Sequence, residues 1–191
     1  MQMMKRMTMV TMILLALAAS SVLAEPIPDK WMLTPRVGYT WMNSNDDGEL
    51  FTGYAVSAAI EHNIYGQAYA LGLSAGYAWA TDEIEAETGN FDIDHTSIPI
   101  LATFKYMFGN QRWTGHLGFG MGVHISSTKA PDVTHEEDSR VGFAMAYPIG
   151  LMFWVTENVN IGASYQFNWL LESYLSDNAS QSANLGVGFQ F

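Results

Sequence analysis

Several features are missing from this sequence, and each absence narrows the class of protein. There is no cysteine among the 191 residues, which excludes disulfide bonds, thiolate metal sites and a lipid attached through an N-terminal cysteine. Beyond the first segment no apolar run reaches 18 residues, so we expect no transmembrane helix. Basic residues are scarce, at 8 against 19 acidic ones. Nucleic-acid binding is therefore disfavoured, because it requires a basic surface.

The first 24 residues have the features of a secretion signal. Lys5 and Arg6 provide the positive start, Met9 to Ala19 is apolar, and Val22-Leu23-Ala24 fits a small-x-small cleavage site. The apolar stretch is too short to cross a bilayer as a helix, although an uncleaved membrane anchor remains the alternative. We therefore predict a signal peptide followed by one domain at 25–191, which has 6 basic and 19 acidic residues and a net charge of −13.

Alternation of apolar with small or polar residues predicts eight strands in this domain. Most of them reach ten residues or more, whereas strands of soluble proteins usually have five or six. A tilted strand that crosses a membrane needs about 9–11 residues, so the lengths favour a membrane protein. The predicted strands are Trp31–Met42, Phe51–Ile60, Gln67–Ala80, Ser97–Phe108, Trp113–Ser126, Arg140–Val155, Asn160–Trp169 and Ser182–Phe191.

The connections between these strands alternate in length, as short periplasmic turns and long external loops do in outer-membrane barrels. The short ones are His62–Gly66, Gly109–Arg112 and Thr156–Val159. The long ones are Asn43–Leu50, Thr81–Thr96, Ser127–Ser139 and Leu170–Gln181, and they hold 15 of the 19 acidic residues. An even number of strands also returns both ends of the domain to the periplasm.

The two faces of the strands differ in a way that suits lipid on one side and a narrow lumen on the other. In the last strand Leu185, Val187 and Phe189 alternate with small or polar residues. Aromatic residues concentrate at the ends of the apolar face and predict interfacial girdles: Trp31, Trp41, Trp79, Tyr106, Trp113 and Trp169. The rival fold is a soluble lipocalin-like barrel with its apolar face inward, and the scarcity of strand charges and the girdles argue against it.

Several segments resemble a known family over nearly all of the domain. They are Ser97-Ile98-Pro99-Ile100 with Phe104-Lys105-Tyr106, Leu117 to Val123 with its alternating glycines, Ala163-Ser164-Tyr165, and Leu185 to Phe191. The chain is similar here to small outer-membrane β-barrel proteins of the OmpA-transmembrane and OmpX/Ail type.

This resemblance implies an eight-stranded antiparallel transmembrane up-and-down β-barrel in the outer membrane of a Gram-negative bacterium. It also implies that Phe191 supplies a C-terminal aromatic signal that the barrel-assembly machinery reads. Roles known in the family are adhesion, host interaction, serum resistance and envelope integrity. The sequence continues no further than the barrel, so we expect the peptidoglycan-binding domain of full-length OmpA to be absent.

Two groups of residues are candidates for chemistry inside the barrel. His124 and Ser126 lie two apart on one face of a strand, where a general base could approach a hydroxyl nucleophile, and an outer-membrane lipid A deacylase family uses such a His-x-Ser pair. We expect this pair to face the lumen, away from lipid, so a structural role is favoured. A second group predicts a lumen charge network, either a plug or a narrow ion path: Arg36, Glu61, Lys105 and Arg140.

Carboxylates in the long loops are weak candidates for a divalent-cation site, without the ordered spacing of an EF-hand: Asp46, Asp47, Glu49, Asp92 and Asp94. The alternatives are attraction of cationic partners and a merely solvated surface. His62, His95 and His135 are too scattered to form a ligand set. We predict no cofactor.

The predicted function is non-enzymatic, a structural and surface-interaction role exerted through acidic external loops. The expected partners are outer-membrane lipid, lipopolysaccharide, the assembly machinery and a surface or host ligand. The alternatives are an enzyme that modifies lipid A and a narrow porin-like channel. General solute transport is disfavoured, because eight strands leave little interior space.

Overall fold

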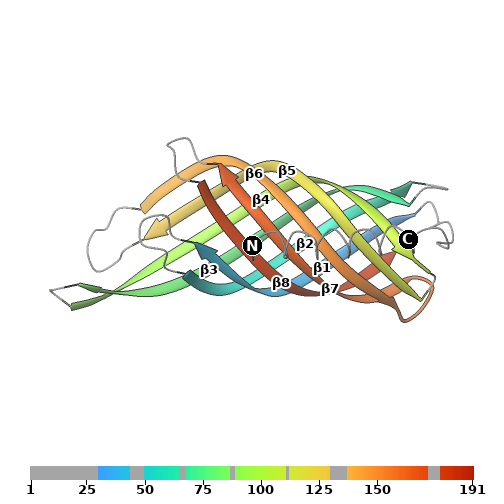
Figure 1. Ribbon diagram of the computed structural model, residues 1–191, viewed down its shortest axis with the longest axis horizontal. Helices are drawn as coiled ribbons and strands as arrows, with labels where there is room; N and C mark the ends of the chain where they lie inside the picture. Colours follow the sequence, from blue (N-terminus) through green and yellow to red (C-terminus); the bar gives the residue numbers. More distant parts are fainter. Residues whose placement is uncertain are drawn as a thin grey trace, which may run out of the picture.

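The computed structural model describes residues 30–43, 50–64, 68–86, 89–110, 112–129, 137–171 and 177–191. These residues form eight strands (Figure 1): β1 Trp31–Asn43, β2 Leu50–Ile64, β3 Tyr69–Ala86, β4 Gly89–Gly109, β5 Trp113–Lys129, β6 Glu137–Trp154, β7 Val159–Leu171 and β8 Asp177–Gln190. Within this part of the chain, no helix is long and apolar enough to cross a membrane. The predicted signal peptide lies outside the described residues.

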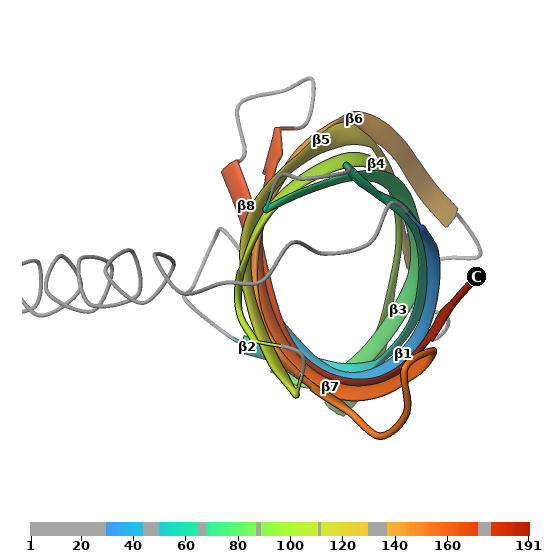
Figure 2. The same cartoon turned by 90° about the vertical axis from the view of Figure 1, so that its right-hand side faces the viewer.

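The strands close into a ring in which each pairs antiparallel with its sequence neighbours and β1 also pairs with β8 (Figure 2). Backbone hydrogen bonds run in both directions between Trp31 and Phe191. Paired residues followed from Met32 around all eight strands return to β1 at Met42, ten residues further along. Eight strands with this stagger tilt by about 40° and enclose a space that side chains can fill. The predicted eight-stranded antiparallel barrel is confirmed.

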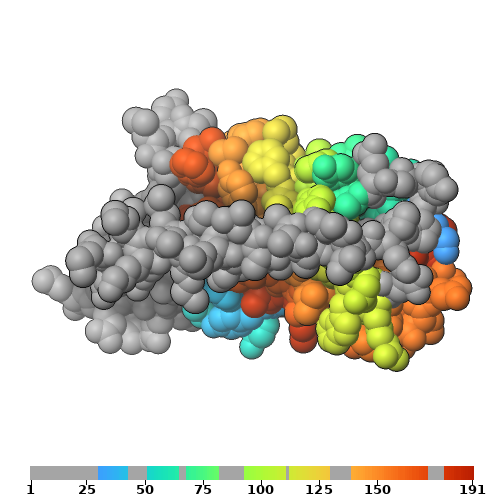
Figure 3. Space-filling model, turned by 45° about the vertical axis from the view of Figure 1, so that its right-hand side comes forward, coloured from blue at the N-terminus to red at the C-terminus, as the bar shows by residue number. Residues whose placement is uncertain are grey.

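The alternation of the sequence becomes a lipid-side face and a lumen face. Large apolar side chains are exposed on the outside, among them Val37, Leu73 and Leu185, and Figure 3 shows part of this surface. The lumen is largely polar, with two small apolar clusters: Met32, Ala70, Met107 and Met152, and Leu101, Ala144, Ala146 and Leu170. The apolar face therefore points outward, opposite to its direction in a lipocalin-like barrel.

Aromatic rings contact one another at both ends of the outer surface. At the short-turn end the ring centroids of Trp113 and Phe153 lie 4.7 Å apart. At the long-loop end Tyr54 and Trp79 lie 6.1 Å apart, and Trp169 is exposed. Rings with an apolar body and a polar edge suit the boundary between lipid tails and headgroups, as the predicted girdles require.

The hairpin of β3 and β4 is the main departure from the predicted loops. The segment Thr81–Thr96 was expected to be a long loop, but the two strands remain paired as far as Ala86 and Gly89. Pairing of β3 with β2 ends at Thr81, and pairing of β4 with β5 starts at Asp94. The hairpin therefore projects past both neighbours as a two-stranded ribbon (Figure 1). Hydrogen bonding between its own strands outweighed the polar composition that suggested a loop.

The predicted short turn Gly109–Arg112 is held by local chemistry. Gly109 has φ 124°, a left-handed conformation that favours glycine. Asn110 Oδ1 accepts hydrogen bonds from the backbone N–H of Arg112 and of Trp113, both at 2.9 Å. In the turn Thr156–Val159 the Thr156 hydroxyl likewise accepts from the backbone N–H of Val159. Both turns lie at the same end of the barrel, opposite the β3–β4 hairpin.

Candidate functional site

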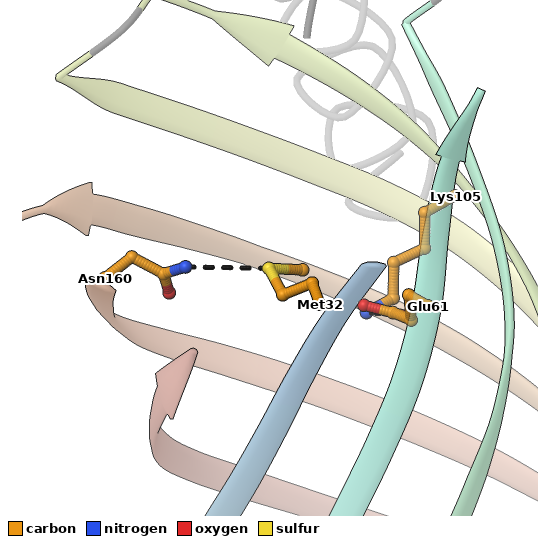
Figure 4. A network of polar contacts seen from close by, with 4 residues as sticks. All are labelled: Met32, Glu61, Lys105 and Asn160. Atoms are coloured by element: carbon orange, nitrogen blue, oxygen red, sulfur yellow. Dashed lines mark hydrogen bonds and ion pairs between the residues drawn. The ribbon is translucent and has the colours of Figure 1, made fainter. Parts of the chain in front are cut away.

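A buried ion pair lies in the half of the lumen near the short turns. Lys105 of β4 and Glu61 of β2 meet with 2.5 Å between Nζ and Oε1, and their side chains are 4% and 1% exposed. The strand between them contributes only small residues at this level, since Glu61 pairs with Gly72 and Lys105 pairs with Ala70. The small residues of β3 thus let the two long side chains meet over its inner face (Figure 4).

Arg36 of β1 and His116 of β5 adjoin this pair. The charge of Arg36 interacts with those of Glu61 and Lys105, and buried His116 lies within reach of both cations. Gly150 leaves room for the His116 ring, because a Cβ there would lie 2.9 Å from Nε2. We call Arg36, Glu61, Lys105 and His116 the charged plug. By residue type it combines two basic groups, Arg36 and Lys105, with one carboxyl group and one imidazole.

Neighbouring polar groups extend the plug toward the short turns. Asn160 Nδ2 donates to Met32 Sδ at 3.5 Å (Figure 4), and Trp154 Nε1 donates to Thr114 Oγ1 at 2.9 Å. Asn63 is also buried here, 1% exposed. This density of side chains leaves little free lumen at the end near the short turns.

The structure brings together three of the four residues predicted for the lumen network and places Arg140 elsewhere. Arg140 lies opposite Ser126, which pairs with Ser97 of β4. Lys105 is eight residues further along that strand, which is about 26 Å at the rise of a β-strand. The side chain of Arg140 is exposed at the long-loop end. His116 was not among the residues predicted for the network, although its even position in β5 already placed it on the face of His124.

On the long-loop side of the charged plug lies a cavity of about 50 Å³, which we call the polar well. Its charged lining residue is Arg36. The remaining polar lining consists of hydroxyl and amide side chains: Thr40, Ser57, Ser74, Ser97, Gln166, Asn168, Ser180, Ser182 and Asn184. A site of this size and polarity holds only a few water molecules or a small solute.

His124 and Ser126, the candidate catalytic pair, face the lumen as expected. Their side chains are 1% and 4% exposed, and their strand neighbours are Pro99 and Ser97 of β4. Neither residue is without an interaction partner. Since the substrate of a lipid A deacylase lies in the outer leaflet, this position separates the pair from lipid by the barrel wall.

The surface histidines and carboxylates form no ligand set in the described part of the chain. Asp94 Oδ1 accepts a hydrogen bond from the Thr81 hydroxyl at 2.8 Å, His95 Nδ1 lies 3.0 Å from Thr128 Oγ1, and the His62 ring packs on Trp31. No group of three or more metal-ligating side chains occurs among the residues whose side chains are placed. Asp46, Asp47, Glu49 and His135, and the side chain of Asp92, lie outside them, so a divalent-cation site stays a prediction.

An apolar-outside, polar-inside barrel with aromatic girdles and one set of short turns is the architecture of a bacterial outer-membrane protein. A family model described as "Outer membrane protein beta-barrel domain" matches residues 10–191. The chain belongs to this family, as the sequence resemblance predicted, and it is a protein of the Gram-negative outer membrane. No curated protein sequence matches it.

Solved structures share the fold at low sequence identity. Neisserial surface protein A is 17% identical, with 84% of this chain and 97% of that chain covered and a TM-score of 0.64. Ail, the attachment invasion locus protein of Yersinia pestis, is 18% identical, with 86% and 100% covered and a TM-score of 0.54. The outer membrane enzyme PagL is 17% identical, with 83% and 98% covered, and its TM-score of 0.49 is too low to support any argument.

Proposed function

We propose that this barrel serves as a scaffold that presents an acidic surface for binding positively charged partners outside the cell. The observation that supports it best is the projecting β3–β4 hairpin. Its register pairs Glu83 with Asp92 and Thr81 with Asp94. Because alternate residues of a strand share a face, Glu83, Glu85, Asp92 and Asp94 occupy register positions on one face of the ribbon.

Such an arrangement favours binding over hairpin stability. Like charges directly opposite each other in a sheet are destabilising. A cationic partner would reduce the repulsion among the four acidic residues of this face. Acidic surfaces also raise the association rate of basic proteins by electrostatic steering. The partner class is therefore a basic peptide segment or protein, and sulfated polysaccharides are disfavoured. Ail is named for attachment and invasion, and we propose a role of that general kind here.

The barrel itself supplies the rigid support. The ion pair of the charged plug joins β2 and β4 across the lumen, and the packing of the plug argues against a channel for general solutes. An enzymatic role is disfavoured because the His124–Ser126 pair lies inside the wall. Fold alone does not decide this point, since one architecture hosts several activities.

The test compares binding of a fluorescent lysine-rich peptide to neutral-lipid vesicles that contain the refolded protein. Four substitutions together remove the acidic residues of this one face: Glu83→Gln, Glu85→Gln, Asp92→Asn and Asp94→Asn. We expect wild type to bind the peptide in low salt, with affinity falling as salt rises, and the fourfold variant to lose most of that affinity. Glu157→Gln is the matched control, because Glu157 is exposed in the turn at the other end of the barrel. Equal binding by the fourfold variant and wild type would refute the proposal.

A further inference from the structure

The charged plug has two basic residues, Arg36 and Lys105, but one acidic residue, Glu61. Glu61 is in contact with Lys105, which leaves Arg36 as the excess cation. Among the described residues, Arg36 makes no ion pair within 4 Å and no side-chain hydrogen bond, and the opposite charge that acts on it is that of Glu61. A guanidinium held inside a barrel requires an anion or water as its partner.

Space around Arg36 is provided by glycine on the neighbouring strands. A Cβ at Gly186 of β8 would lie 2.8 Å from Arg36 Cγ. A Cβ at Gly38 of β1 would collide with the side chain of Asn184. Larger residues at these two positions would displace the side chains of Arg36 and Asn184, both of which line the polar well. The sequence thus keeps open the volume into which Arg36 and Asn184 extend.

Hydrogen-bond donors also converge on the well. Asn184 Nδ2 donates to Ser182 Oγ at 2.9 Å, so the hydroxyl hydrogen of Ser182 remains available to donate. On β7, Gln166 Nε2 donates to Asn168 Oδ1 at 2.7 Å.

Asn168 Nδ2 then donates to Ser180 Oγ at 3.0 Å. A chain of two amides therefore ends at Ser180 and a single amide ends at Ser182, and both serines line the well. No described acidic side chain lines it.

We propose that the polar well is a binding site for a small inorganic anion of halide size, held by the Arg36 guanidinium and the hydroxyls of Ser182 and Ser180. A cation joined by neutral donors, without a carboxylate, selects negative charge. The volume of about 50 Å³ is too small for a lipid headgroup. A bound anion would neutralise the excess charge of the plug and so stabilise the closed barrel.

The first experiment locates the anion directly. The wild-type mature barrel is crystallised from detergent in sodium bromide, and anomalous scattering is recorded at the bromine edge. We expect a bromide peak in hydrogen-bond contact with the Arg36 guanidinium and Ser182 Oγ. A map with bromide only on the outer surface, or none in the polar well, would overturn the proposal without any need for a variant.

The second experiment measures linkage between binding and stability. Chloride replaces gluconate at constant ionic strength, and the midpoint temperature of the boiling-dependent shift in gel mobility is followed. We expect the wild-type midpoint to rise with chloride, the rise to vanish in Arg36→Gln and to shrink in Ser182→Ala. Arg140→Gln, which removes an exposed cation, should keep the full response.

An equal chloride response in wild type, Arg36→Gln and Ser182→Ala would show that chloride acts elsewhere and would refute the site. If Arg36→Gln does not fold, Ser182→Ala and the bromide map decide. In a third arm inorganic phosphate replaces chloride. Stabilisation by phosphate with none by chloride would overturn the assignment to an anion of halide size.

Discussion

Lys105 Nζ lies 2.5 Å from Glu61 Oε1 across the inner face of β3, and Arg36 is the third charge of the group. The arrangement is asymmetric, because Glu61 contacts Lys105 directly and acts on Arg36 only from beyond 4 Å. Removing the carboxylate leaves Lys105 without a contacting partner and removes the attraction on Arg36, whereas removing Lys105 still leaves Glu61 facing Arg36. Stability should therefore depend more on Glu61 than on Lys105.

Glu61→Gln should lower the free energy of unfolding by about 3–5 kcal/mol, the usual cost of breaking a buried ion pair from one side. Lys105→Gln should cost clearly less. Urea unfolding of the refolded barrel, followed by gel mobility without boiling, measures both, with Glu157→Gln as an exposed control. Equal losses in the two variants would mean that Arg36 does not interact with Glu61 as described.

Gly118→Ala, a substitution in the neighbouring strand β5, should disturb the Lys105–Glu61 pair. A Cβ at this position would lie 2.8 Å from Lys105 Cγ and 2.6 Å from the Phe104 carbonyl oxygen, and such overpacking costs about 1–3 kcal/mol. Gly120 is two residues along the same face, where the nearest atom to a Cβ is 3.4 Å away. Gly120→Ala should be close to neutral in the same urea titration. A larger loss at Gly120 than at Gly118 would contradict the packing described.

The absence of native cysteine makes the orientation of the barrel directly testable. Glu85→Cys, near the tip of the β3–β4 hairpin, should react with a membrane-impermeant maleimide in intact cells. Glu157→Cys, in a short turn, should react only after the outer membrane is permeabilised. The reverse pattern would place the acidic hairpin in the periplasm and exclude the proposed surface role.

His124→Ala and Ser126→Ala should leave the acylation of lipid A unchanged in cells that express the protein, because both side chains are buried in the lumen. Mass spectrometry of extracted lipid A, compared with cells that lack the protein, measures this. Acyl loss that depends on the protein and disappears in either variant would restore the enzymatic alternative.

Phe191→Ala should reduce the amount of protein in the outer membrane if Phe191 is the predicted assembly signal. The unfolding midpoint of the refolded variant should change little, because the side chain is 66% exposed. Phe189→Ala is the control, an outward aromatic residue of β8 that is 45% exposed. Comparable losses in the two variants would argue against a specific terminal signal.

Much of the architecture could be predicted from the chain because period two survives in every strand. Strand β5 was predicted at 113–126 and found at Trp113–Lys129. The predicted strand boundaries were wrong where composition was misleading, as in the β3–β4 hairpin, whose acidic residues suggested a loop. Backbone pairing between adjacent strands sets those boundaries. Residue type is a poor indicator of such pairing where a hairpin extends beyond the membrane.

The sequence by itself determined the number of strands, the division of each into an apolar and a polar face, and the positions of Arg36, Glu61, Lys105 and Arg140 on polar faces. Only the closed barrel decided which of these charges meet. Membership of a polar face tells which side of the barrel wall a residue occupies. Its position along the barrel axis depends instead on the stagger accumulated around all eight strands. That stagger brings Lys105 to Glu61 and carries Arg140, on the same kind of face, to the opposite end.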